Sequence, residues 1–319
     1  MGSEIEIVST GGAVSTEVAD LIADARDYAA ASKAPNTVRA YRSSWRDFDA
    51  WTTEHDLDAL PASPATVVLY LTDRANAGIK VSTLRIALAA IGAAHQAAGL
   101  EFNAKQRDLV AVWSGIRRKL GVRTERKAPV LKDDLADMLD KLDRTTLAGK
   151  RDAALLLVGF GAALRRSELV ALDVADMSIS REGVKVVVKR SKTDQEGAGT
   201  EIGIASGRAA AAVQEWISAA GLTTGPLFRM VRKGGHLTAD RLTDKSVADI
   251  VKRLAGAAGL DAARYSGHSL RAGLATSAAL AGAGLTSIMK QTRHKSVDVA
   301  KTYIRDADLW RDNVSALVL

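Results

Sequence analysis

The spacing of apolar residues constrains the fold of this 319-residue chain more than any other feature. From about residue 15 to about residue 120, apolar residues recur with the helical period almost throughout. Tyr41, Trp45 and Phe48, at i, i+4 and i+7, mark one such stripe. This half of the chain is predicted to be a bundle of about five helices, the last over roughly 106–119.

Capping residues locate several helix ends in this half. Asn36 is expected to cap the second helix, because its side chain can accept a hydrogen bond from the first turn. Ser63 followed by Pro64 is typical of an N-cap and a first helical residue. Ser82 is expected to cap the next helix, which ends at Gly99.

A second unit begins near residue 131, and its period changes part-way along. Residues 153–164 are apolar on every side, which predicts a buried central helix. VKVVVK at 184–189 and EIGI at 201–204 have β-like composition and flank a turn-rich loop, so a small hairpin is expected in an otherwise helical unit. Further helices are predicted at about 207–220, 243–256, 269–281, 285–291 and 296–304, with another short one at the C-terminus.

Length and composition fit two mainly α-helical domains. At about 100–200 residues per domain, 319 residues suggest two. We expect a tail over 1–14, a helical unit over 15–120, a basic linker over 121–130 and a second unit over 131–319. The chain has no cysteine, which excludes disulfides, thiolate metal sites and cysteine nucleophiles. The sequence contains neither a transmembrane run nor a signal peptide, so a cytoplasmic protein without a membrane partner is expected.

The charge balance favours a polyanionic partner. The chain carries 44 Lys and Arg against 37 Asp and Glu, a net charge of +7. Residues 117–127 hold six basic residues and one acid, without apolar periodicity. We interpret this segment as a linker that contacts the polyanion. The alternative is an ordinary solvated face.

Several chemistries lack any sequence support. The chain contains no P-loop, no G-x-S-x-G elbow and no H-E-x-x-H motif, and its acidic residues lack metal-ligand spacing. Nucleotide hydrolysis, serine hydrolysis and zinc chemistry are therefore disfavoured. We expect neither a metal nor a small-molecule cofactor.

The second unit instead contains a series of basic residues that ends in a tyrosine. In chain order the series is Arg165, Lys192, His268, Arg271, His294 and Tyr303. His268 and Arg271 are three residues apart in GHSLRAG, which places both on one side of a helical turn. Taken singly, each residue has an ordinary explanation, such as a salt-bridged arginine, a solvated lysine or a half-buried tyrosine. Together, their order and spacing are specific.

This order and its surrounding motifs resemble the tyrosine recombinases, the phage integrase family. LRRSEL, GHSLR and RHKS followed by YIR match the three boxes of that family. YSGHSLRAG and TYIRD are similar to the Cre-like site-specific recombinases in particular, and NTVRAYRSSWRDFDAW resembles the family's first DNA-gripping helix. The resemblance covers about 34–310. It implies an N-terminal helical core-binding bundle and a mostly helical catalytic domain with a small β-hairpin, which together form a C-shaped clamp on double-stranded DNA.

The residue types suit transesterification at a DNA phosphodiester. Arg165 and Arg271 would offer bidentate forks to the phosphate. Tyr303 would be the covalent nucleophile, and Lys192 would protonate the leaving 5′ oxygen as a general acid. No metal or ATP is needed, because the phosphotyrosine bond conserves the energy of the broken phosphodiester.

Supporting roles are also implied by the resemblance. His268 would accept or relay the proton of the nucleophile, and His294 would hydrogen-bond a phosphate oxygen. Glu168 would orient the neighbouring side chains. The chain departs from the family in one respect, because the family usually has Gly before the third-box His and this chain has Arg293. The geometry of the turn at that point is therefore an open question.

Contacts to DNA are expected in both halves. Arg39 and Lys245 match family positions that approach the major groove, where a basic side chain can contact guanine. The alternative is that both touch phosphate only. Further phosphate contacts are expected from Arg85, Arg117, Arg118, Lys119 and Arg123.

The C-terminal segment resembles a helix that docks into a neighbouring subunit in this family. Its apolar residues are Leu309, Trp310, Val314 and Leu317. Folding back onto its own domain is the alternative. The resemblance implies a homotetramer on two inverted-repeat sites, which exchanges strands through a 3′-phosphotyrosine and a Holliday junction. The rival interpretations are a type IB topoisomerase, which relaxes DNA as a monomer, and a catalytically silent DNA-binding protein.

Overall fold

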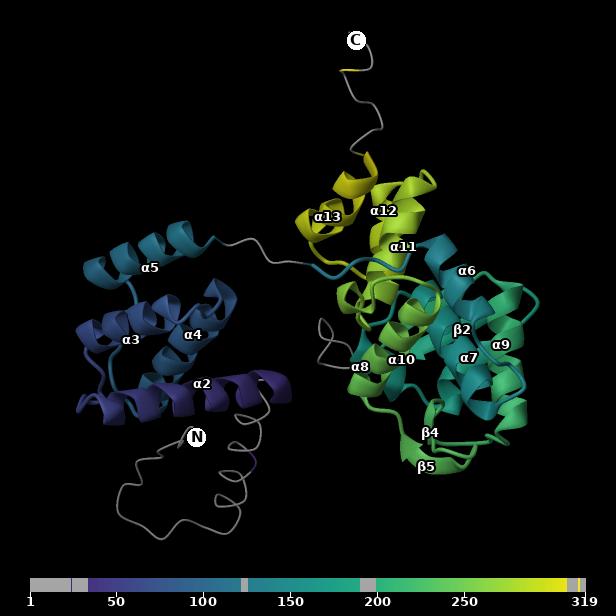
Figure 1. The fold of residues 1–319 in the computed structure, drawn as a ribbon, viewed down its shortest axis with the longest axis horizontal. Coiled ribbons are helices and arrows are strands. Elements are labelled where there is room, and N and C mark those ends of the chain that lie inside the picture. The colour runs from purple at the N-terminus through teal and green to yellow at the C-terminus, as the bar shows by residue number, and fades with distance from the viewer. Residues whose placement is uncertain (1–23, 25–33, 122–125, 190–198, 309–314, 316–319) are drawn as a thin grey trace. The chain divides into compact units, whose positions relative to one another are not determined.

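The computed structural model describes residues 24, 34–121, 126–189, 199–308 and 315, with the backbone alone for residues 35 and 304–308. The chain divides into two compact units, residues 1–125 and 126–319. Both are mainly helical, as the sequence predicts, and the strands that the structure describes lie in the second unit (Figure 1). None of the described helices is long and apolar enough to cross a membrane.

The first unit is a helical bundle in the part that the structure describes. Its helices are α2 (Pro35–Glu54), α3 (Pro64–Asn76), α4 (Val81–Ala97) and α5 (Arg107–Leu120). α2 packs on α4, and α3 packs on α5. Phe48, Tyr70 and Ile91 are fully buried between them, and the rings of Phe48 and Tyr70 meet edge to face at 5.0 Å between centroids. Of the predicted apolar stripe, Phe48 therefore lies in the core of this unit, and the partly buried Trp45 packs against it.

The caps of these helices are partly as predicted. Ser63 caps α3, where its hydroxyl accepts a hydrogen bond from Thr66 N at 3.0 Å. Asn36 and Ser82 are not caps, so those two predictions are wrong. α2 begins two residues earlier, at Pro35 with Ala34 as its N-cap, and the Asn36 side chain accepts a hydrogen bond from Arg39 instead. α4 likewise begins at Val81, after Lys80.

The basic segment 117–127 is not a linker along its whole length. α5 continues to Leu120, so the first three basic residues form its last turn, where cations interact favourably with the helix dipole. This agrees with the predicted helix over roughly 106–119, which includes these three residues. At the far end, Ala128 N donates to Arg264 O at 2.7 Å and Val130 N donates to Ser269 O at 2.9 Å. The chain after the segment is thus bound to the second unit.

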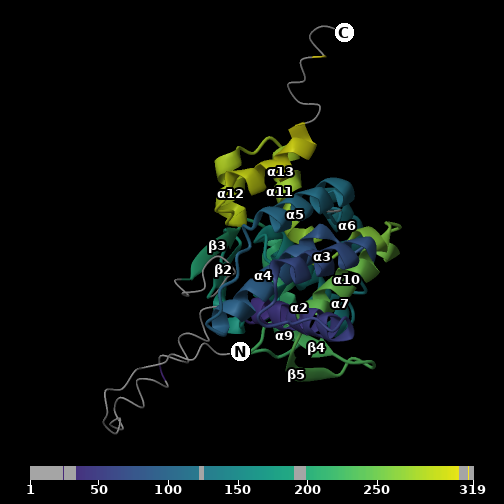
Figure 2. The ribbon, with the colours of Figure 1, turned by 90° about the vertical axis from the view of Figure 1, so that its left-hand side faces the viewer.

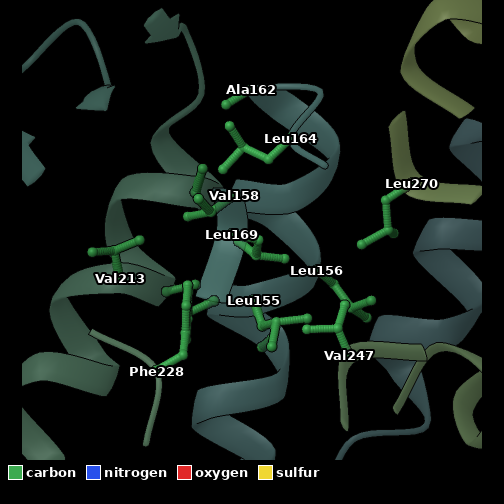
Figure 3. Packing of buried hydrophobic residues seen from close by; sticks show 14 of the residues in the cluster. Leu155, Leu156, Val158, Ala162, Leu164, Leu169, Val213, Phe228, Val247 and Leu270 are labelled. Atoms are coloured by element: carbon green, nitrogen blue, oxygen red, sulfur yellow. The ribbon is translucent and has the colours of Figure 1, made fainter. Parts of the chain in front are cut away.

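The core of the second unit surrounds α7 (Leu147–Gly161). Leu155, Leu156 and Val158 are fully buried. Leu156 lies beside Val247, while Phe228 lies on the other side of α7 (Figure 3). The prediction of a buried central helix is confirmed. Around it lie α6 (Lys132–Asp140), α8 (Arg166–Ala171), α9 (Gly207–Ala219), α10 (Asp244–Ala257), α11 (Ser269–Leu280), α12 (Leu285–Thr292) and α13 (Val297–Asp308), with 3₁₀ turns at Val174–Asp176 and Ala262–Arg264.

The predicted hairpin is present within a slightly larger sheet. β2 (Val184–Val188) pairs with β3 (Thr200–Ile204) in antiparallel register, with Val188 opposite Thr200 (Figure 2). β1 (Met177–Ile179) adds a third strand beside β2. It is only three residues long and mostly exposed, so it has no apolar alternation that the sequence could reveal.

A second hairpin, β4 (Arg229–Val231) with β5 (Leu237–Arg241), was not predicted from the sequence. Both strands are short, and neither has a fully buried residue. Their register depends on tertiary contacts instead. Arg241 donates to the carbonyl oxygens of Val170 and Leu172 at 2.7 and 2.9 Å, which attaches β5 to the end of α8.

Gly273 in α11 lets the Val130 carbonyl approach the helix. A Cβ atom at this position would lie 1.8 Å from Val130 O, a backbone atom that cannot move freely. We expect Gly273→Ala to destabilise the second unit by about 1–3 kcal/mol, the usual cost of overpacking. Hydrogen exchange of the amides of α11 measures this loss.

Gly256→Ala is the matched control, because it also lies in a helix of the second unit but its Cβ would meet only ordinary contact, at 3.7 Å from Ala262 Cβ. It should raise stability by about 0.5–1 kcal/mol, because alanine favours the helix. Equal protection of the α11 amides from hydrogen exchange in the two variants would contradict the close approach of the Val130 carbonyl to Gly273.

Candidate active site

Glu168 organises the first part of the site. Arg165 is the N-cap of α8, and the carboxylate of Glu168 turns back to accept its backbone N–H at 2.9 Å through Oε2. Oε1 accepts Arg165 Nη1 at 2.6 Å. Glu168 is only 3% exposed. Burial alone would raise the pKa of this carboxyl, but Arg293 and the hydrogen bonds from Arg165 outweigh it and lower the pKa. Glu168 is therefore a buried anion that holds the Arg165 side chain.

Arg271 enters the same region from α11. Its side chain is buried, and Nη1 donates to Ala163 O at 2.7 Å. Ala163 lies in the turn between α7 and α8, two residues before Arg165, and has a left-handed backbone with φ of 47°. Burial, followed by the charges of Arg165 and Arg293, lowers the pKa of Arg271 to about 10. Segments more than a hundred residues apart in sequence thus bring two arginines together.

His268 lies directly before α11, as its N-cap residue. Its edge is open to solvent. Desolvation by the surrounding protein, then the charges of Arg271, Arg165 and Arg166, lower its pKa below the ordinary 6.5. A neutral ring at pH 7 is able to accept a proton.

His294 and Tyr303 lie face to face. His294 follows α12, and Tyr303 belongs to α13. Their ring centroids are 5.5 Å apart and their planes are inclined by 19°. Tyr303 is half-buried and packs against a small apolar cluster that includes Ala275 and Ile288. α13, which carries Tyr303, packs against α11, which carries Arg271.

The tautomer of His294 follows from its neighbours. Thr292 Oγ1 lies 2.6 Å from Ile288 O, to which it donates its only proton. The same oxygen lies 2.8 Å from His294 Nδ1, so it must accept a hydrogen bond from Nδ1–H. Nε2 is therefore the nitrogen without a proton in the neutral ring. Burial, then the charges of Arg271, Arg165, His268 and Arg293, lower the pKa of His294 to about 4.

We expect NMR to find His294 neutral, with the proton on Nδ1, from pH 8 down to about 5. Its folded-state pKa lies below the unfolded value, so its stabilising contribution is present above about pH 6.5 and is lost as the pH falls toward 4. Long-range ¹H–¹⁵N spectra, assigned with a His294→Gln variant, measure both properties. A titration near pH 6.5 would contradict the charged surroundings described above.

Arg293 was noted in the sequence only as a departure from the family. The structure shows that the turn forms nonetheless, with Arg293 as the left-handed C-cap of α12 at φ 57° and ψ 41°. Its Nη2 donates to Glu168 Oε2 at 2.9 Å and to Ala163 O at 3.2 Å. A third arginine therefore belongs to the cluster, which sequence reasoning missed. The only signal was a long basic side chain where the family has glycine.

Gln291 is a second residue that the sequence did not single out. Its Nε2 donates to Gly161 O at 2.7 Å and to Gly203 O at 3.0 Å. These two bonds connect α12 to the end of α7 and to β3. The predicted Lys192 lies outside the described residues, but β3, the strand that follows its loop, is thereby attached to the helix that precedes His294.

The predicted DNA contacts divide between the two units. Arg39 and Arg85 are exposed on α2 and α4, and the cluster Arg117, Arg118 and Lys119 is exposed in the last turn of α5. Lys245 is exposed in the first turn of α10. None of them belongs to the arginine cluster. Arg123 and the four docking residues Leu309, Trp310, Val314 and Leu317 lie outside the described residues. In the part that the structure describes, no three His, Asp or Glu side chains are grouped so as to hold a metal ion.

Comparisons with known proteins agree with this arrangement. The model of the phage integrase family matches residues 130–309, and the model of the phage integrase N-terminal SAM-like domain matches residues 27–101. The integrase/recombinase xerD homologue of Selenomonas ruminantium is 40% identical over 290 residues, covering 88% of this chain and 85% of that protein. The recombinase cre of Escherichia phage P1 is 28% identical over 293 residues, covering 86% and 84%.

A solved structure shares the fold. The XerH site-specific recombinase, in a post-cleavage complex with a palindromic difH substrate, covers 96% of this chain and 85% of its own with a TM-score of 0.66. The sequence identity is 14%, so this likeness concerns the fold alone.

Proposed function

Since this chain belongs to the phage integrase family and is a tyrosine recombinase, we propose that it acts on double-stranded DNA at inverted-repeat sites and joins strands through a 3′-phosphotyrosine. The observation that carries the proposal is that Glu168 and Ala163 O hold Arg165 and Arg271, while Tyr303 stacks on His294 in a helix, α13, that packs against α11. The DNA complexes of similar recombinases support the choice of partner.

The first step would be capture of the scissile phosphate by the two arginines. Arg165 is held by Glu168 and Arg271 by Ala163 O, so neither guanidinium has to be ordered when DNA binds. Arg271 Nη2 is buried without a hydrogen-bond partner among the described residues. A non-bridging phosphate oxygen would supply that partner.

Strand cleavage would follow as an in-line exchange at phosphorus. The Tyr303 oxygen forms a bond to phosphorus as the bond to the 5′ oxygen breaks. The phenolic proton passes to neutral His268, and Lys192 gives a proton to the leaving oxygen, which becomes a 5′-hydroxyl. His294 can donate to a phosphate oxygen only with a proton on Nε2, and an adjacent phosphate favours that form by raising the pKa.

The reverse step would join a different strand. The 5′-hydroxyl of a partner site attacks the phosphotyrosine and releases Tyr303, which gives a Holliday junction. A second pair of cleavages resolves it. The energy of the phosphodiester is conserved throughout, so the reaction as proposed consumes no ATP. Four subunits on two sites, joined by the C-terminal residues from Leu309 on, would perform both rounds in the bacterial cytoplasm, where the DNA lies.

The decisive experiment is strand exchange between two DNA molecules. Footprinting of the full chain on inverted repeats beside its gene would define the site. Two differently labelled duplexes with that site should then yield recombinant products and a Holliday intermediate. Relaxation of a supercoiled plasmid without any exchange would establish the type IB topoisomerase alternative. A footprint without a covalent adduct would establish a silent DNA-binding protein.

A further inference from the structure

Arg293 lies where backbone geometry disfavours arginine. Its φ of 57° and ψ of 41° are left-handed. Glycine adopts this conformation at no steric cost, whereas other L-residues pay roughly 1–2 kcal/mol. The turn itself would form more easily with glycine. The side chain must therefore contribute something that offsets the strain.

The contacts of that side chain all belong to the active site. Arg293 Nη2 donates to Oε2 of Glu168, the same oxygen that accepts the backbone N–H of Arg165. It also donates to Ala163 O, the carbonyl that anchors Arg271. One guanidinium thus touches the support of both phosphate-site arginines. Its side chain is only 11% exposed.

The charges in this cluster do not balance. Arg165 and Arg293 both pair with Glu168, and Arg271 pairs with no carboxylate in the part of the chain that the structure describes. Three buried nitrogens, Arg293 Nε, Arg293 Nη1 and Arg271 Nη2, have no hydrogen-bond partner there. Burying unpaired cationic donors costs several kcal/mol. A cluster built in this way is prepared to receive an anion.

We propose that Arg293 is a positioning residue of the phosphate site, which takes up part of the charge of Glu168 and so leaves Arg165 and Arg271 free to hold the scissile phosphate. This inference rests on the proposed function. It extends the two-arginine site to three cations, with the third attached to α12 just before His294. The same charge reaches both neighbours, because Arg293 is among the groups that lower the pKa values of Arg271 and His294.

The role is tested by changing the charge of the phosphate as well as that of the protein. Cleavage by the full chain is measured in single turnover on two nicked substrates, one with the natural scissile phosphate and one with a neutral methylphosphonate. Arg293→Gln should slow cleavage of the phosphate about a hundredfold, the usual effect of removing one preorganised donor. It should slow cleavage of the methylphosphonate far less. Arg293→Lys, which keeps the charge, should recover part of the lost rate.

Arg144→Gln is the matched control, because it removes an arginine that pairs with Glu215 instead. It should cleave both substrates like the wild type. If Arg293→Gln slows cleavage of the two substrates by the same factor, the role of Arg293 is merely structural and the proposal is overturned. Wild-type rates on both substrates would overturn it as well.

A second measurement separates this inference from the proposed function. At constant ionic strength, inorganic phosphate should raise the melting temperature of the wild-type chain more than that of Arg293→Gln, since the ion binds the folded cluster. Equal shifts would overturn the role of Arg293 whether or not the protein cuts DNA. Unequal shifts in a protein that forms no covalent adduct would support the anion site and contradict the proposed recombination.

Discussion

Tyr303→Phe is expected to abolish covalent attachment of the protein to DNA. The phenolic oxygen is the nucleophile that the protein supplies for cleavage in the proposed reaction, and phenylalanine keeps the ring that stacks on His294. The fold and the affinity for the site should therefore persist. The loss is measured on denaturing gels with a nicked suicide substrate. This substrate traps the adduct because the short released fragment, which carries the free 5′-hydroxyl, diffuses away. Filter binding or footprinting checks that the variant still binds.

Tyr265→Phe is the matched control for that experiment. Tyr265 is also buried in the second unit, but its hydroxyl lies 3.4 Å from Asp134 Oδ2, and it takes no part in the cluster. It should form the adduct normally. A denaturation-resistant adduct with Tyr303→Phe would show that another residue is the nucleophile. Loss of the adduct in both variants would indicate that the assay reports folding instead.

Glu168→Ala is expected to destabilise the second unit by about 3–5 kcal/mol, the cost of removing one partner from a buried ion pair. The carboxylate is almost inaccessible to solvent and accepts hydrogen bonds from Arg165 and Arg293. Without it, both guanidinium groups lose their counter-ion. Hydrogen exchange of α7 and α8 in the full chain measures the loss within this unit alone. Glu168→Gln should destabilise the second unit less, because the glutamine amide oxygen still accepts a hydrogen bond.

The pH dependence gives this prediction a second test. The pKa of Glu168 is lowered in the folded chain, so its contribution is present above the unfolded value of 4.5 and is lost as the pH falls through the folded value. The difference in the free energy of unfolding between the wild type and Glu168→Ala should therefore become smaller at acid pH. Glu201→Ala removes an exposed partner of Lys185 and should cost at most about 1 kcal/mol. A similar small cost for Glu168→Ala would contradict the buried anion.

Much of the fold could be predicted from sequence because its signals are local. The apolar faces of α2 and α10, the Ser63 cap and the apolar run that starts at residue 153 in α7 each depend on residues within one or two turns. β4 and β5 gave no such signal, since their pairing depends on Arg241 reaching the carbonyl oxygens at the end of α8.

The sequence alone determined that the chain is mainly helical and that a hairpin interrupts its second half, and it predicts six side chains that would carry the chemistry. Those properties follow from periodicity and from residue types in a fixed order. Only the tertiary structure decided that Arg293 joins the cluster, that Glu168 is shared by two arginines, and that His294 carries its proton on Nδ1. The contact between Arg293 and Glu168 joins the end of α12 to α8, 125 residues away in the sequence, and the proton of His294 is placed by hydrogen bonds in the folded turn that ends α12. Neither these distances nor the burial that shifts the pKa values of the site can be predicted from the local order of residues.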